Sequence, residues 1–106
     1  MPVLDTREIP VIEKLPGWSG RFFHSASLTF GHWEFLAGSL IHEHFHPQEE
    51  VWEILEGELE LTIDGAASVI RPGIVAMVPP NTPHSARALS NGKAIVVDYP
   101  QRLDFR

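Results

Sequence analysis

The histidines and acids between Gly38 and Gly57 are the residues of this chain that could do chemistry as a group. His44 and His46 are two residues apart, and Glu50 follows after four more. On a β-strand, residues two apart point to the same face about 6.6 Å from each other, so both imidazoles could bind one ion. Imidazole and carboxylate groups suit Fe(II), Mn(II), Ni(II), Zn(II) or Cu(II), and the ligand types alone do not choose among these metals.

Glu50 can reach the same ion only if the chain reverses direction before it. A straight strand would carry Glu50 about 13 Å beyond His46. Pro47 and Gln48 predict a turn, after which Glu50 begins an antiparallel strand that faces the histidines. His84 follows a rigid, proline-rich loop and is expected to supply a fourth ligand. Such a set would leave open positions on a six-coordinate ion for water or substrate.

Composition narrows the class of protein and of site. At 106 residues the chain is predicted to form one domain. Its formal net charge of −6 argues against nucleic acid as a partner, because phosphate binding needs a basic face. The sequence contains no run of about 18 apolar residues, so no membrane span is predicted. The N-terminus lacks the features of a signal peptide. There is no cysteine, so any metal must be held by nitrogen and oxygen, and a cytoplasmic location is the default expectation.

Short strands separated by turn signals predict the elements that position these groups. The expected strands cover residues 21–30, 32–46, 51–55, 59–63, 68–70, 74–78, 84–89 and 94–99. No segment among them has a helical period, which predicts an all-β sandwich or barrel. Residues 1–20 are expected to form an extended N-terminal arm, with an edge strand, that could pack on a partner subunit. Disorder up to about residue 8 is the alternative interpretation. The β-barrel domain then covers residues 21–106.

Alternation along these strands predicts which side chains face inward. The apolar residues expected to fill the barrel are Leu36, Leu40, Leu59, Leu61, Ile63 and Met77. The strand at residues 74–78 is apolar on both faces, so part of its outer face should also be covered. A second subunit is the simplest cover.

These residues resemble the cupin superfamily. Its first motif, Gly-x5-His-x-His-x3-Glu-x6-Gly, is matched at every position and spacing by Gly38, His44, His46, Glu50 and Gly57. The match is specific, because it fixes five residues and all the spacings between them.

The second cupin motif, Gly-x5-Pro-x-Gly-x2-His-x3-Asn, is matched in part. Gly73, Pro79 and His84 agree with it, whereas Asn81 replaces a glycine and Ala88 replaces the final asparagine. Asparagine tolerates the left-handed conformation that a turn demands, so the first departure is mild.

The resemblance implies a small, single-domain cupin of the cupin 2 type, folded as a double-stranded β-helix or jelly-roll barrel. It implies His44, His46, Glu50 and His84 as ligands of one divalent transition metal ion. Small cupins of this kind commonly form homodimers, which agrees with the excess apolar surface.

Other residues are candidates for the pocket around the metal. His42 shares the predicted face of His44, and Trp52 shares that of Glu50. A rim histidine and a packed core tryptophan are the simpler interpretations of these two. Arg87 and Tyr99 could contact an anionic or hydroxylated substrate if they face inward, whereas a surface arginine and a packed tyrosine are the simpler interpretations.

The resemblance favours a metal-dependent enzyme of the dioxygenase type that acts on a small organic molecule, with Glu50 as both ligand and proton acceptor. A metal-dependent isomerase or lyase, such as a decarboxylase, is the alternative enzyme, since fold alone does not select a reaction. A module that binds or senses a small ligand without catalysis is the other alternative. A metal that only stabilises the fold ranks last, because the barrel has many apolar strand residues.

Overall fold

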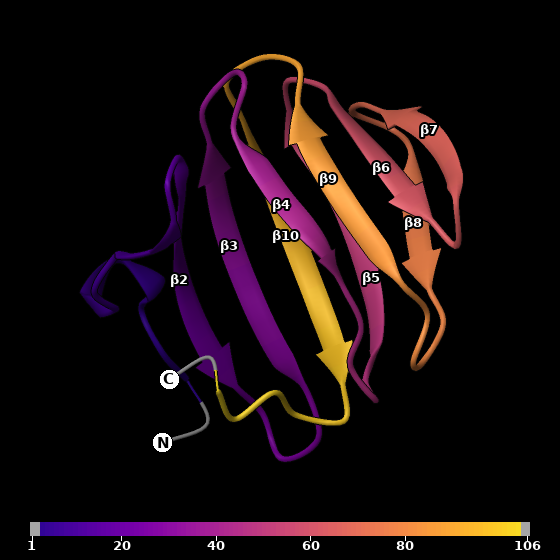
Figure 1. Ribbon diagram of the computed structural model, residues 1–106. Helices are drawn as coiled ribbons and strands as arrows, with labels where there is room; N and C mark the ends of the chain where they lie inside the picture. The colour runs from indigo at the N-terminus through magenta and orange to yellow at the C-terminus, as the bar shows by residue number, and fades with distance from the viewer. Residues whose placement is uncertain (1–2, 105–106) are drawn as a thin grey trace.

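Two antiparallel β-sheets pack face to face in the computed structural model, which describes residues 3–104 (Figure 1). The strands are β1 (Ile12–Leu15), β2 (Trp18–His24), β3 (Thr29–Phe35), β4 (Leu40–His44), β5 (Glu49–Glu56), β6 (Leu59–Ile63), β7 (Ala66–Ile70), β8 (Val75–Val78), β9 (His84–Ala88) and β10 (Gly92–Tyr99). One sheet has the order β1-β2-β3-β10-β5-β8, and the other has the order β4-β9-β6-β7. This architecture confirms the predicted all-β jelly-roll fold.

The core lies between the two sheets and is rich in aromatic rings. Trp18 is fully buried and makes edge-to-face contacts with Trp33 and Trp52, at centroid distances of 6.1 and 6.3 Å. From the four-stranded sheet, Leu59 and Leu61 point into the same core, as predicted. Each such aromatic pair adds about 0.5–1.5 kcal/mol beyond the area it buries. The strands that carry the candidate site residues are therefore held by a closely packed core.

The prediction of one strand over residues 21–30 was wrong, because β2 and β3 are joined there by a tight turn. Ser25 and Leu28 close this turn through a backbone hydrogen bond of 2.9 Å. Serine also caps the turn, since its hydroxyl accepts a hydrogen bond from the backbone N–H of Leu28 at 3.0 Å.

Gly31 lies inside β3 and does not end a strand, contrary to expectation. A Cβ atom at Gly31 would approach Trp33 Nε1 to 2.8 Å and Phe22 Cε1 to 3.2 Å. Glycine is therefore used here to let two aromatic rings approach the backbone, which is a role of strand glycines.

The predicted strand over residues 32–46 is interrupted between β3 and β4. The chain turns at Gly38, which has a φ of +85° that favours glycine. Leu36 and Leu40 flank this turn and are 59% and 62% exposed, so they do not fill the barrel. Met77 also faces outward, on edge strand β8, and is 66% exposed. For these three residues the prediction of a core position was wrong.

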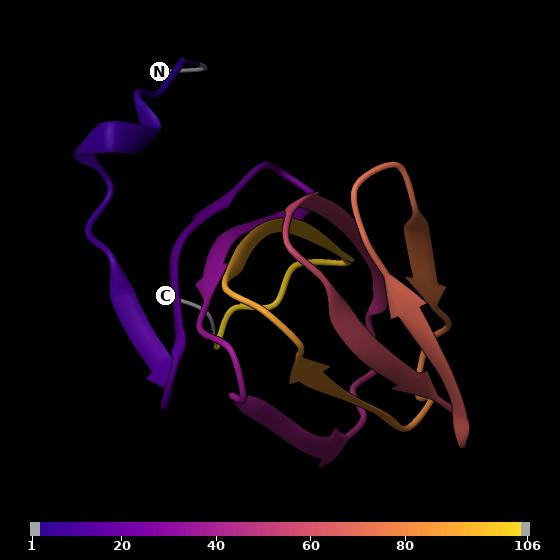
Figure 2. The ribbon, with the colours of Figure 1, turned by 90° about the horizontal axis from the view of Figure 1, so that it is seen from above.

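The N-terminal segment has two parts. Residues 3–8, with a short 3-10 helix at Thr6–Glu8, extend away from the sandwich (Figure 2), and the Ile9 carbonyl then accepts a hydrogen bond from Arg21 of β2 at 2.9 Å. The next residues belong to the large sheet, because β1 pairs with β2 and β2 begins at the buried Trp18. The sheet thus starts before the expected domain boundary at residue 21. No helix within residues 3–104 is long and apolar enough to cross a membrane.

Candidate metal centre

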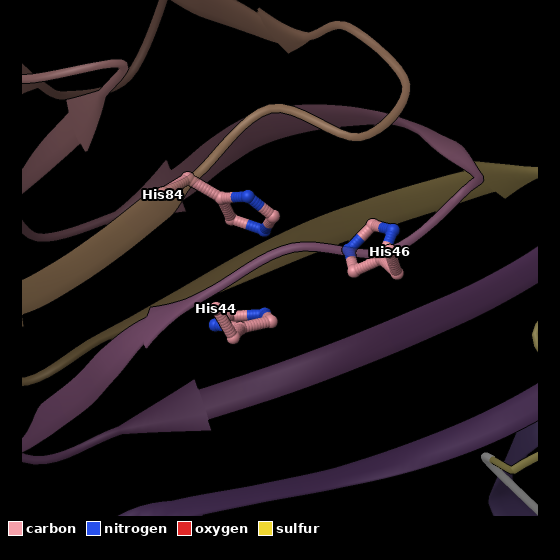
Figure 3. Close-up of side chains that lie close together, drawn as sticks. All are labelled: His44, His46 and His84. Atoms are coloured by element: carbon pink, nitrogen blue, oxygen red, sulfur yellow. The ribbon is translucent and has the colours of Figure 1, made fainter.

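Three histidines from two neighbouring strands meet at one end of the sandwich. His44 ends β4, and His84 begins the adjacent strand β9, where the two residues are direct partners across the ladder. His46 lies in the loop after β4 and is only 9% exposed. One ring nitrogen from each histidine lies within 4.8 Å of those from the other two. Figure 3 shows the three imidazoles turned toward one another.

Backbone carbonyls hold all three imidazoles in the same way. The contacts are His44 Nδ1 to the His42 carbonyl (2.9 Å), His46 Nδ1 to the Gln48 carbonyl (3.1 Å) and His84 Nδ1 to the Thr82 carbonyl (2.8 Å). A carbonyl oxygen only accepts hydrogen bonds, so each Nδ1 carries the proton. In the neutral rings, Nε2 is then the nitrogen with a lone pair for a metal, a tautomer fixed by its backbone partner.

Glu50 approaches the histidines from the opposite sheet. Its strand, β5, pairs with β10 and β8, whereas β4 pairs with β9. Pro47 and Gln48 therefore carry the chain from one sheet to the other. The predicted antiparallel hairpin between the histidine strand and the Glu50 strand was wrong. The reversal of direction expected at these two residues nevertheless places Glu50 beside the imidazoles, where it is 3% exposed.

The contacts between Glu50 and the histidines fit a bound cation. Nε2 of His46 lies 3.3 Å from Glu50 Oε1, and Nε2 of His84 lies 3.2 Å from Oε2. Both nitrogens are buried and have no hydrogen-bond partner. Since a lone-pair nitrogen and a carboxylate oxygen are both acceptors, they repel at this distance unless a proton or metal ion lies near both. The donor set and its unpaired atoms therefore suit a divalent transition metal ion.

Two further side chains orient the Glu50 carboxylate. Trp52 donates its indole N–H to Oε2 at 2.7 Å, and Arg102 Nη1 lies 3.5 Å from Oε1. Burial tends to raise the pKa of Glu50, but the neighbouring His46 and His84 side chains outweigh it and hold this pKa well below its ordinary value. Glu50 is therefore ionised and available as a ligand.

The pKa values of His44 and His84 are shifted in opposite directions. Burial is the main influence on His44 and lowers its pKa, which favours the neutral, metal-binding ring. At His84, burial also lowers the pKa, but the neighbouring Glu50 and the Thr82 carbonyl outweigh it, so the net pKa is raised. Because a metal binds the neutral ring, metal binding at His84 would compete with protonation of that ring.

Asp98 adds a second carboxyl group that the motif comparison did not identify. It is the ladder partner of Glu50, is 1% exposed, and has an Oδ1 atom with no hydrogen-bond partner. Burial, and then the charge of Glu50, raise the pKa of Asp98 to about 9. Its carboxylate also groups with His46 and Glu50, with ligand atoms within 4.8 Å of one another. Asp98 could have been found from the sequence, because it has the same parity as Ala94 and Val96 and is a charged residue at an inward-facing position of the strand.

A cavity of about 330 Å³ opens beside these groups. Its lining residues are Lys14, Leu15, Trp33, Ile41, His42, His44, Glu50, Trp52, Val96, Arg102 and Asp104. Two of the residues named from the sequence, His42 and Trp52, thus lie on its wall. The volume is that of a small-molecule site.

Arg87 and Tyr99 do not line this cavity. Arg87 is exposed on the four-stranded sheet, where it lies 3.6 Å from Glu60. Tyr99 is 56% exposed on the outer side of the large sheet. The arginine that does line the cavity is Arg102, which follows the last strand. No strand alternation extends to that position, so the sequence pattern gives no sign of its direction.

Comparisons with known proteins identify the family and the fold of this chain. Residues 31–100 match the model of the cupin domain family. The chain is 33% identical over 64 residues to MJ1618, an uncharacterized protein of Methanocaldococcus jannaschii. That alignment covers 58% of this chain and half the length of the relative.

Two solved structures are similar over nearly their whole length. An RmlC-like cupin from Shewanella frigidimarina has a TM-score of 0.90 at 24% identity, covering 97% of this chain and 94% of that one. KdgF from Halomonas sp. has a TM-score of 0.89 at 23% identity, covering 96% of each chain. At these identities the likeness establishes the fold. Because the family match also covers more than half of the sequence, the chain belongs to the cupin family.

Proposed function

We propose that this cupin is a metal-dependent enzyme of the dioxygenase type that acts on a small organic molecule. One observation carries the proposal: the buried Nε2 atoms of His46 and His84 converge on the Glu50 carboxylate without hydrogen bonds, and Glu50 and His44 line a cavity large enough for a substrate. A structural metal would need no such cavity. The proposed ligands are His44, His46, Glu50 and His84, holding one divalent ion.

The residues around the ion have separate roles in this proposal. A bound divalent ion would supply Lewis acidity or a site for oxygen. Glu50 would serve as ligand and proton acceptor, with Trp52 fixing its direction through the indole N–H. The apolar walls formed by Leu15, Trp33 and Val96 would exclude water from the reacting molecule.

A metal-dependent isomerase or lyase is the second candidate. It is favoured by the presence of a second carboxyl group, Asp98, directly beside Glu50, because isomerisation and decarboxylation both require proton transfer. A module that binds a small ligand without turnover is the third candidate. The three differ in whether oxygen is consumed and whether any product forms.

Oxygen uptake separates these candidates. Protein loaded in turn with Fe(II), Mn(II) or Ni(II) is mixed with phenolic and diketone compounds in an oxygen-electrode cell, with His84→Ala as the inactive control. We expect substrate-dependent uptake with at least one metal and none with the variant. Product formation without oxygen uptake would favour the isomerase or lyase, and ligand binding without any product would favour the binding module.

We also propose that the chain forms a homodimer. Exposed apolar side chains gather on the outer face of the large sheet near edge strand β8, namely Leu55, Val75, Met77 and Tyr99. Burying them against the same face of a second copy would remove this apolar surface from water.

A further inference from the structure

The segment after β10 is fixed in place and carries an arginine into the cavity. The backbone N–H of Arg102 donates to the Thr29 hydroxyl at 2.8 Å. Gln48, in the loop that follows His46, donates its side-chain amide to the Gln101 carbonyl at 3.1 Å. The Arg102 side chain is only 11% exposed, so the guanidinium is held at the cavity wall and does not extend into solvent.

A second cation lies on the same wall. Lys14, from edge strand β1, lines the cavity and donates to the Asp104 carbonyl at 3.3 Å. Its ammonium group also lies 5.3 Å from the centre of the Phe22 ring. Two cationic side chains from opposite ends of the sequence thus flank one side of the cavity, in a chain whose net charge is −6.

The charges of the lining favour an anionic ligand once a metal is bound. Lys14 and Arg102 are balanced by two acids, Glu50 and Asp104, which lie 3.5 and 3.3 Å from Arg102. A divalent ion held by the histidines and Glu50 would add two positive charges to this balanced set. A ligand with a carboxylate would offset part of that excess in a cavity where charges are poorly screened.

Arginine is suited to that role by its shape. The planar guanidinium offers five N–H donors and binds a carboxylate through two parallel hydrogen bonds. The other walls of the cavity, formed by Leu15, Trp33 and Ile41, are apolar. A ligand that binds both the cationic wall and the apolar walls of the cavity would carry an acid group on an apolar body.

We propose that Arg102, assisted by Lys14, binds the carboxylate of the substrate, so that the substrates of this enzyme are small organic acids with an apolar or aromatic body. The proposal rests on the proposed function in assuming that the substrate occupies this cavity beside the metal. It names a specificity-determining residue outside residues 31–100, the part of the chain that matches the cupin domain.

Benzoate and its neutral counterpart benzamide test the proposal by calorimetric titration. We expect metal-loaded protein to bind benzoate at least tenfold more tightly than benzamide. Arg102→Gln should weaken benzoate binding about 10- to 100-fold, the effect of losing charge-assisted hydrogen bonds, and weaken benzamide binding much less, so that the ratio of the two affinities falls toward one. Arg102→Lys should retain part of the preference, because it keeps the charge and loses the planar fork. Arg87→Gln, which removes an exposed arginine outside the cavity, is the matched control and should bind as wild type.

The outcomes separate this proposal from the metal-enzyme proposal. Equal binding of benzoate and benzamide by the wild type, or unchanged benzoate affinity in Arg102→Gln, would overturn the role of Arg102 even if the metal is present. If the protein takes up no metal, the proposed function fails. The same titration on metal-free protein then still tests the role of Arg102. We expect metal-free wild type to bind benzoate more weakly than metal-loaded protein would, and Arg102→Gln to bind it more weakly still. Melting temperature and metal content of each variant show whether the fold and the histidine site are intact.

Discussion

At the scale of single residues, the orientation of each imidazole in the site is set by a hydrogen bond from its Nδ1 atom to a backbone carbonyl. The Nδ1 atoms of His44, His46 and His84 all face backbone carbonyls, which leaves their Nε2 atoms as the nitrogens that can bind an ion. Glu50 brings carboxylate oxygens to within 3.3 Å of two of these atoms. Ring orientation is set by the backbone, and we expect it to persist when the ion is removed.

Asp98 gives the metal-free protein a characteristic dependence of stability on pH. Its pKa is raised from an ordinary 3.8 to about 9, so the folded chain holds this proton more tightly than the unfolded chain does. The resulting stabilisation is complete below about pH 4 and is lost as the pH rises toward 9. Glu50 has the opposite shift, and its contribution is lost only below its ordinary pKa of 4.5. Glu50 therefore adds little pH dependence between pH 5 and 8, and a comparison with Asp98→Asn separates the effect of Asp98 from that of His44 and His84, which both proteins share.

We accordingly expect Asp98→Asn to gain stability over the wild type as the pH rises from 5 to 8. The gain should be at most about 1.4 kcal/mol per pH unit, the value for one proton. Urea unfolding of both metal-free proteins at four pH values measures it. A difference in unfolding free energy that stays flat over this range would show that Asp98 is ionised in the folded chain.

At the scale of strands and loops, the later part of the chain could be predicted because its signals are local. Asp64-Gly65, Arg71-Pro72-Gly73 and the proline loop before His84 mark turns by their own backbone preferences, and the structure has strands on either side of each. The cupin motifs also predict, from fixed spacings alone, that His44, His46, Glu50 and His84 lie close together, and the structure places them so. Their role as metal ligands stays a prediction.

The errors arise where contacts between distant segments decide the structure. Gly31 suggests a strand end on its own, but it continues a strand because two aromatic rings pack over it. The reversal at Pro47 suggests a hairpin, but β4 before it and β5 after it belong to different sheets and pair with other strands. Arg102 lies beyond the last strand and has no periodic neighbours, and contacts with distant residues, namely the hydrogen bonds of its segment and its ion pair with Glu50, hold it at the cavity.

At the scale of the whole molecule, the exposed apolar face of the large sheet predicts an assembly of two chains. We expect a mass near twice 11.9 kDa by sedimentation equilibrium. Met77→Glu should shift the protein to monomers, because it would place a charge in the proposed interface without disturbing the core, as Met77 is 66% exposed. Leu89→Glu, at an exposed apolar position in the loop after β9, is the control and should remain dimeric. A wild-type protein that is monomeric at micromolar concentration would contradict this assembly.

The metal content of the purified protein is the most direct test of the four-ligand centre. Elemental analysis by mass spectrometry should find about one divalent transition metal ion per wild-type chain. His84→Ala should lose most of it, because the variant removes one of the four ligands, whereas His32→Ala, on the outer side of β3, should keep it. Full metal content in His84→Ala, or none in the wild type after growth with these metals, would contradict the four-ligand centre.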